Sequence, residues 1–228
     1  MSRYKPYPAY KDSGVEWIGE VPEHWKVCRL ATVGSLCKGN GGTKADDTDE
    51  GVPCIRYGDL YTAYDFLVSN IKKYIRDNVS DNYTKIKFGD LLFAGSGETL
   101  EEIGKSVVNL DRREARCGGD VIILRPYREF DSTFLAYAAG AAPSQIQKSL
   151  MGKGFTVIHI YSEDLRNLII TEPPQSEQKT IGRAIAHETT IIDTLIAKTK
   201  HSIDILKERR SAIITAAVTG KIDIREAA

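Results

Sequence analysis

Residues 173–221 read PPQSEQKTIGRAIAHETTIIDTLIAKTKHSIDILKERRSAIITAAVTGK, and this stretch decides the architecture. Between Gly182 and Gly220 it contains neither proline nor glycine. Pro173 and Pro174 stand where a helix can begin, and Gly220 stands where a helix is commonly capped. The stretch therefore predicts one helix over 176–219, about 66 Å long at 1.5 Å per residue. Such a helix is longer than a small domain is wide, so we expect it to need a partner.

One face of this helix is apolar at coiled-coil spacing. Alternate steps of four and three residues from Ile181 to Ala216 meet eleven positions, of which seven are apolar. This pattern is typical of a coiled-coil seam with polar interruptions. The competing interpretation is a helix that packs lengthwise on its own domain. We expect the dimer or helix interface to contain Ile181, Ile185, Ile192, Leu195, Leu206 and Ile213.

The chain before this helix is predicted to form a mixed α+β domain. Short apolar runs alternate with glycine-rich turns and predict strands over 52–57, 85–88, 90–95, 106–110, 120–126, 156–160 and 167–171. One helix is expected over 132–150, with Ser132 or Asp131 as its N-cap. Because strands and helices do not alternate regularly, a doubly wound sheet is disfavoured. The expected organisation is a globular domain over 1–172 with an extended N-terminal arm, followed by a helical region over 173–228.

Composition excludes several classes of function. Lys and Arg together number 31, as do Asp and Glu, so net charge gives no basic footprint for nucleic acid. No apolar run approaches the roughly 18 residues that a membrane span needs, and the first residues do not form a signal peptide. The four cysteines form no CxxC pair, which favours free thiols and a cytoplasmic location.

Catalytic and metal-binding motifs are weak. Residues 93–97 read FAGSG, which matches the FxGxG turn of S-adenosylmethionine-dependent methyltransferases. The [DNS]PP[YF] motif of base-amine methylation is not matched, since Glu172 and Gln175 flank the only Pro-Pro pair. The four histidines have no ligand spacing, so neither a metal nor a catalytic residue is assigned.

Two stretches carry a specific family resemblance. The first is residues 10–25, YKDSGVEWIGEVPEHW, followed by Arg29 and Leu30. The second is PPQSEQ at 173–178, continued by LKERRS at 206–211 and AVTGKID at 217–223. Together they resemble the specificity subunit of type I restriction–modification systems. That subunit has two target-recognition domains and two long helices, whereas this sequence has one of each and so resembles a half-subunit.

The resemblance implies a function and a set of partners. The domain over 1–172 would be a target-recognition domain that reads double-stranded DNA, and the chain would hold methyltransferase (modification) subunits, with a restriction subunit joining them. The chain would have no cofactor of its own, since S-adenosylmethionine, ATP and magnesium would belong to the partners. Two copies could pair their helices antiparallel and read a bipartite palindromic site.

Polar residues in loops near strand ends are the expected DNA-binding residues, since forked donors and acceptors read bases and phosphates. Trp17 and Trp25 are interpreted as packing anchors of the arm. Two alternatives stay open: a dimerising adaptor or inhibitor that reads no DNA, and a stand-alone methyltransferase that uses the FAGSG turn. The candidate DNA-binding residues are Lys38, Asn40, Thr43, Lys44, Arg56, Tyr57, Tyr61, Ser96, Lys105, Lys153, Thr156 and His159.

Overall fold

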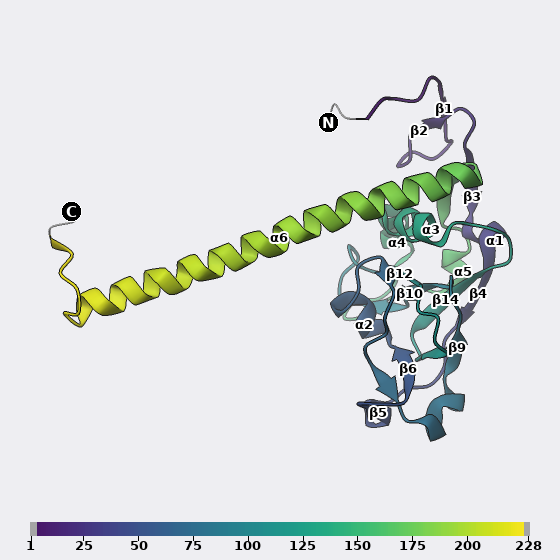
Figure 1. Ribbon diagram of the computed structural model, residues 1–228. Coiled ribbons are helices and arrows are strands. Elements are labelled where there is room, and N and C mark those ends of the chain that lie inside the picture. The colour runs from purple at the N-terminus through teal and green to yellow at the C-terminus, as the bar shows by residue number, and fades with distance from the viewer. Residues whose placement is uncertain (1–3, 226–228) are drawn as a thin grey trace. The chain divides into compact units, whose positions relative to one another are not determined.

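The computed structural model describes residues 4–225 (Figure 1). Contacts divide the chain into two compact units, the first ending at Arg183 and the second starting at Ala184. This division lies later than the boundary expected at residue 172, because the first turns of the last helix pack within the first unit. Residues 1–3 and 226–228, which belong to the two expected regions, lie outside the described residues.

The first unit is built on two mixed sheets. Within residues 4–225 the first sheet has the strand order β4 (Gly34–Lys38), β14 (Val121–Pro126), β10 (Leu91–Ala94), β12 (Ser106–Asn109) and β7 (Leu67–Val68). The second has the order β5 (Asp47–Thr48), β8 (Tyr74–Ile75), β6 (Val52–Ile55), β13 (Ala115–Cys117) and β9 (Thr84–Ile86). Both sheets are mostly antiparallel, with one parallel pair each, β7 with β12 and β6 with β13.

The central strands of the first sheet are buried on both faces. Successive side chains of a strand point to opposite faces, and in β10 Leu91 and Phe93 enter one apolar cluster while Leu92 and Ala94 enter another. The first cluster lies between this sheet and the helices, and the second lies between the two sheets. Double burial explains why β10 and β14 read as continuous apolar runs, and it confirms the expected strands there.

The helices correct two sequence-based expectations. Residues 132–150 form two helices, since Ala141 is extended at φ −67° and ψ 157° and Pro143 opens the second one. The strand expected over 52–57 ends at Ile55, because the carboxylate of Asp59 accepts the Arg56 amide at 2.9 Å and starts a helix. The short helices are α1 (Leu30–Val33), η1 (Lys44–Asp46), α2 (Tyr57–Thr62), η2 (Asp77–Asn82), α3 (Ser132–Gly140), α4 (Ala142–Met151) and α5 (Ser162–Leu165).

The long helix is confirmed. Helix α6 runs without interruption over Gln175–Val218, and Gly220 follows it at φ 72° with the Lys221 amide donating to the Ala216 carbonyl at 2.8 Å. At its other end, Gln178 is buried and accepts the Asp131 amide at 2.9 Å. A Cβ at Gly182 would lie 2.9 Å from Asp131 Oδ1, so glycine permits this close approach. The mixed domain with one long helix is the expected α+β architecture.

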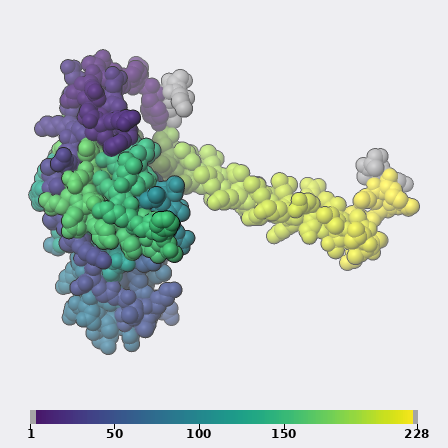
Figure 2. Space-filling view, turned by 180° about the vertical axis from the view of Figure 1, so that it is seen from behind, coloured from purple at the N-terminus to yellow at the C-terminus, as the bar shows by residue number. Residues whose placement is uncertain are grey.

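The two ends of the first unit lie side by side. Strand β3 (Lys26–Arg29) pairs antiparallel with β16 (Ile169–Glu172), directly before α6. Strands β1 (Tyr10–Asp12) and β2 (Glu20–Pro22) pair within the arm, and β11 (Ser96–Gly97) pairs with β15 (Ile158–His159). In Figure 2 the purple arm rests on the green surface of later residues. Within the described chain, no helix has both the length and the apolar character required to cross a membrane.

Candidate nucleic-acid interface

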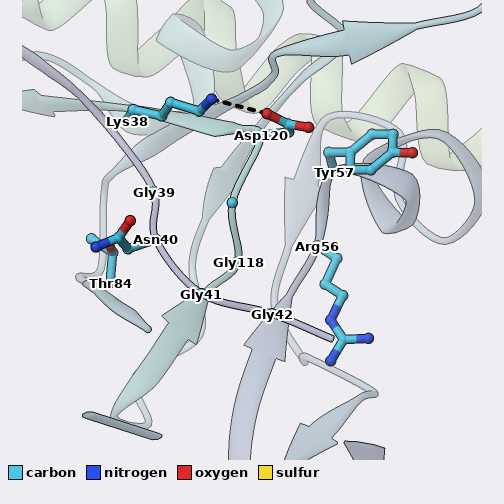
Figure 3. Close-up of a pocket in the computed structure, with 11 residues that line it drawn as sticks. Lys38, Gly39, Asn40, Gly41, Gly42, Arg56, Tyr57, Thr84, Gly118 and Asp120 are labelled. Carbon is cyan, nitrogen blue, oxygen red and sulfur yellow. Dashed lines mark ion pairs between the residues drawn. The ribbon is translucent and has the colours of Figure 1, made fainter. Parts of the chain in front are cut away.

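A cavity of about 530 Å³ opens where the glycine-rich loop after β4 meets the turn between β13 and β14 (Figure 3). The loop comes from the first sheet into the second, and the turn leads from the second sheet back to the first. The cavity thus lies where chain segments cross between the sheets. Its lining residues are Lys38, Gly39, Asn40, Gly41, Gly42, Arg56, Tyr57, Thr84, Gly118, Gly119 and Asp120.

Glycines hold the loop and the turn close together. A Cβ at Gly39 would lie 2.3 Å from the Gly118 carbonyl oxygen, a distance no side chain tolerates. Gly41 adopts φ 84°, which favours glycine, and its carbonyl accepts the Gly119 amide at 2.6 Å. The loop is consequently fixed to the turn by backbone contacts, and polar side chains on either side face one cavity.

Arg56 connects the glycine-rich loop to neighbouring segments of the second sheet. Its guanidinium donates to the Thr43 carbonyl at 2.7 Å and pairs with Asp47 at 2.5 Å, and it reaches the Tyr83 hydroxyl at 3.4 Å. The Tyr83 hydroxyl in turn donates to Asp46 at 2.8 Å. Figure 3 shows the Arg56 side chain directed away from the Lys38–Asp120 pair. These bonds hold the guanidinium against the protein and connect it to the segment that carries Thr43 and Lys44.

Lys38 and Asp120 form an ion pair across the cavity wall, with 3.1 Å between Nζ and Oδ1. Both side chains are well exposed, at 63% and 43%. Asn40 and Tyr57 are exposed as well. The wall therefore offers one cation, one carboxylate, one amide and one aromatic ring to a molecule that approaches from outside.

Two further cavities continue this surface. One of about 440 Å³ shares Tyr57 with the first and adds Tyr61 and Ser96. Another of about 250 Å³ shares Lys38 and Asp120 with the first and adds His159. Because neighbouring cavities share lining residues, they form one hollowed surface, which we call the cavity face. Seven of the predicted residues line it: Lys38, Asn40, Arg56, Tyr57, Tyr61, Ser96 and His159.

The β11–β15 pair places polar groups at fixed positions on this face. Ser96 lies opposite His159 in register, and Ser96 Oγ is 3.0 Å from His159 Nδ1. The Tyr61 hydroxyl donates to the Ser96 carbonyl at 3.0 Å. Burial, with the nearby Glu102 carboxylate, raises the pKa of Tyr61 to about 12. Tyr61 therefore remains a neutral hydrogen-bond donor, while His159 keeps one ring nitrogen outside this bond.

A short loop carries two more predicted residues. Backbone bonds of 2.8 and 2.7 Å between Lys153 and His159 close the loop between them. Thr156 is exposed within it, and Phe155 is fully exposed at 105%. Lys153 Nζ pairs with Asp164 at 3.0 Å. The loop thus adds exposed polar groups next to β15. Its residue Val157 lines the second cavity.

Lys105 is not brought to the cavity face. Its ammonium lies over the Phe66 ring, 5.4 Å from the centroid. Phe66 packs against Tyr137 of α3, with ring centroids 5.0 Å apart, so this side of the sheet belongs to the helices. The cavities are also lined by polar residues that the sequence did not suggest, among them Thr84, Asp120 and Tyr161. Asp120 had a signal, since it follows Gly118-Gly119 in a turn between two strands.

The two stretches that carry the family resemblance meet at Glu177. Its carboxylate accepts Trp25 Nε1 at 2.9 Å and the Tyr7 hydroxyl at 3.3 Å, and it lies 2.7 Å from His24 Nε2. Burial acts to raise the pKa of Glu177, but the hydrogen bonds from Trp25 and His24 outweigh it and hold that pKa below its usual value. This cluster fastens the N-terminal arm to the first turn of α6, and in it Trp25 packs as an anchor of the arm.

Helix α6 carries an exposed apolar stripe with polar interruptions. Of the predicted interface residues, Ile192, Leu195, Leu206 and Ile213 are exposed, between 45% and 61%. Ile181 and Ile185 are partly buried within the chain. At 100° per residue, three further exposed residues fall on the same stripe and were missed by the four-and-three stepping, namely Ile196, Ile203 and Ile214. The stripe is accordingly wider than the predicted seam.

The methyltransferase interpretation of residues 93–97 is wrong. The turn leaves β10 and continues into strand β11, whereas a cofactor-binding turn of this kind leads into a helix. A Cβ at Gly97 would lie 2.7 Å from the Tyr61 hydroxyl, so this glycine admits a tyrosine side chain. Among residues 4–225, no group of three or more His, Cys, Asp or Glu side chains is placed to hold a metal ion.

The chain is similar to known specificity proteins over most of its length. The model of the type I restriction modification DNA specificity domain matches residues 22–204. The chain is 25% identical over 208 residues to the type I restriction enzyme EcoKI specificity subunit of Escherichia coli K12, covering 90% of this chain and 44% of that protein. It is 26% identical over 204 residues to the putative type I restriction enzyme MjaX specificity subunit of Methanocaldococcus jannaschii, covering 86% and 46%.

Solved structures share the fold. The HsdS subunit from Thermoanaerobacter tengcongensis superposes with a TM-score of 0.60 at 19% identity, covering 93% of this chain and 48% of that one. A structure of a type I R-M system assembly gives 0.64 at 20% identity, covering 86% and 46%. The chain thus spans about half the length of these relatives. Specificity subunits are non-catalytic components of type I restriction–modification enzymes. Since the family model covers most of the chain, including the cavity face, this protein belongs to the type I restriction–modification DNA specificity family.

Proposed function

We propose that this chain is the DNA-recognition component of a type I restriction–modification complex and that its cavity face contacts the target duplex. The observation that carries this proposal is the convergence of seven predicted residues on one hollowed surface within the family's specificity domain. The surface mixes amide, carboxylate, hydroxyl and ammonium groups, which are the donors and acceptors that read base edges. Tyr57 adds an exposed ring that can pack on a sugar or a base.

The charge of the face suits recognition within a complex more than tight binding by the chain alone. Lys38 pairs with Asp120 and Lys153 pairs with Asp164, so cations and carboxylates alternate over the surface. Non-specific affinity for DNA comes mainly from unpaired Lys and Arg on phosphates. We therefore propose that partner subunits supply much of the phosphate binding, while this chain supplies the choice of sequence.

The chain acts as a homodimer in this proposal. The exposed apolar stripe of α6 offers an interface for a second copy. Helix α6 has 44 residues, about 66 Å at 1.5 Å per residue. An antiparallel pair would present two identical cavity faces related by a two-fold axis, so the target would be bipartite and palindromic. Half-sites one to two turns apart would be about 34–68 Å from each other.

The partners follow from the same proposal. Methyltransferase (modification) subunits would dock beside the paired helices, and a restriction subunit would join to cut unmodified DNA in the cytoplasm. S-adenosylmethionine, ATP and magnesium would be bound by those partners, and this chain would position the partners on their target.

Methylation mapping tests the proposal. The chain is coexpressed with the modification subunit of its own system, and adenine methylation is mapped across a plasmid library by long-read sequencing. We expect one enriched motif made of two identical inverted half-sites with an unread spacer. A complex that forms but methylates no defined motif would contradict DNA reading and would favour the adaptor or inhibitor alternative. An asymmetric motif would contradict the homodimer.

A further inference from the structure

We propose that Asp120 determines part of the sequence specificity, by accepting a hydrogen bond from the exocyclic amino group of a cytosine or adenine in the major groove. In the free protein Lys38 is its counter-ion. This inference rests on the proposed function of the cavity face, and it assigns one base-reading residue there.

The position of Asp120 is the first argument. It lies in the turn between β13 and β14, where the chain passes from one sheet to the other, and it lines two of the three cavities. Its carbonyl accepts the Gly95 amide at 2.7 Å, so the backbone of the turn is held against the end of β10. A side chain at this position is presented from a rigid support, and Figure 3 shows the Asp120 carboxylate beside the Lys38 ammonium in the first cavity.

The backbone conformation is the second argument. Within residues 4–225, Asp120 is the one non-glycine residue with a positive φ, at 58°. Glycine adopts this region without strain, yet the chain has glycine at 118 and 119, whose φ angles lie outside it, and aspartate where φ is positive. Aspartate in turns commonly bonds a nearby backbone amide. Among the described residues this carboxylate pairs with Lys38, so the conformation is not explained by a side-chain bond to the turn.

The neighbouring glycines keep the approach to Asp120 open. A Cβ at Gly118 would lie 3.4 Å from the Gly41 carbonyl oxygen, and one at Gly119 would lie 3.3 Å from the same atom. The first distance is an ordinary contact and the second is tighter than most, so neither φ nor severe crowding demands glycine there. Because Gly118 and Gly119 have no side chains, the space beside Asp120 stays open. The edge of a base can therefore reach the carboxylate.

Electrostatics restricts what Asp120 can bind. Phosphates repel a carboxylate on a DNA-facing surface, so the carboxylate needs a hydrogen bond from the DNA to offset this repulsion. In the major groove only the amino groups at cytosine N4 and adenine N6 donate such a bond. The Lys38–Asp120 pair is exposed and of low strength, so it can open at little cost. On DNA binding the long Lys38 side chain can move to a phosphate while Asp120 turns to the base, and both charges stay satisfied.

Three variants test the assignment by the same methylation mapping. Asp120→Gly fits the positive φ and removes the carboxylate, so it should fold as the wild type does. We expect the wild-type motif with one position degenerate in each half-site, its base preference reduced roughly tenfold. Asp120→Asn keeps the shape and presents an amide, which pairs with adenine N6 and N7, so a cytosine position should shift toward adenine and an adenine position should stay adenine. Asp81→Asn, an exposed carboxylate outside the cavities, is the matched control for charge.

The outcomes separate the two proposals. If the wild-type complex methylates no defined motif, the proposed function fails and this inference fails with it. If the wild type has a motif and both Asp120 variants reproduce it with equal preferences, only the assignment of Asp120 is overturned. A uniform loss of methylation with an unchanged motif would also overturn it, because Asp120 would then support the turn and read no base. Thermal unfolding of each variant confirms that the fold is retained.

Discussion

The centre of the first sheet and helix α6 are both rich in apolar side chains, but the sheet buries them and the helix exposes them. In β10 and β14 the apolar side chains are buried on both faces, so this part of the chain completes its own core. Along α6 after Arg183, isoleucine and leucine side chains of one stripe stay about half exposed. Burial of apolar area stabilises folding and association alike. The difference teaches that the first unit completes an apolar core of its own, while the stripe of α6 is an apolar surface that the described residues leave about half exposed.

The largest expected effect is the loss of stability when a core side chain of the first sheet is removed. Phe93 is fully buried in β10, so Phe93→Ala should lower the free energy of unfolding by about 3–5 kcal/mol. Leu195→Ala removes an apolar side chain that is 57% exposed, and at concentrations where the chain is monomeric it should have little effect. Urea unfolding followed by tryptophan fluorescence measures both. Equal losses for the two variants would show that the stripe of α6 is buried within its own chain.

The second prediction concerns the stripe itself. The double variant Ile192→Glu, Leu195→Glu places two charges in the proposed seam and should weaken dimerisation at least 100-fold, about 3 kcal/mol. Thr194→Glu, Ala197→Glu is the matched control, since those exposed residues lie on the opposite side of the helix. Light scattering across a concentration series gives the dissociation constants. If the seam variant and the control dimerise equally, the assigned interface is wrong.

The smallest effect concerns a charge inside the core. Lys148 of α4 is fully buried, its ammonium donates to the Gly104 carbonyl at 2.8 Å, and it lies over the Phe93 ring. Burial, reinforced by the like charge of Lys105, lowers the pKa of Lys148 to about 7. Between that value and the ordinary lysine pKa near 10.4, the unfolded chain binds more protons than the folded one. Stability should therefore rise with pH in this window.

Lys148→Met measures this contribution. From pH 6 to pH 9 the stability of the wild type should increase by about 2–3 kcal/mol more than that of the variant. Urea unfolding at both pH values gives the two differences. Parallel pH profiles for the wild type and Lys148→Met would mean that Lys148 titrates as it does in the unfolded chain.

Local sequence signals predicted most of the elements. The start and end of α6 depend on Pro174 and Gly220, which act on the backbone whatever surrounds them. The central strands were visible as apolar runs, because burial on both faces leaves no polar positions. The helix expected over 132–150 was wrong, since the break at Ala141 depends on Pro143 and on how α3 packs, and a composition rich in alanine conceals it.

The cavity face was predicted only in part. Polar residues next to glycines suggested Lys38 and Asn40, because loops at strand ends commonly carry binding groups. Lys105 has the same residue type and a similar setting in sequence, yet its side chain lies on the helix side of the sheet, over Phe66. Asp120 was missed although it follows two glycines in a turn, because its positive φ and its pairing with the distant Lys38 appear only in the folded chain.

The sequence alone determined the long helix, its apolar stripe, the buried central strands and the family resemblance, since each depends on periodicity or on short motifs within one segment. The tertiary structure decided which loops meet. The contact of Glu177 with the arm, the approach of Gly39 to Gly118 and the position of Asp120 between two cavities all join residues from distant segments. Such contacts follow from how two sheets pack and where the chain crosses between them, and no local pattern in the sequence encodes that geometry.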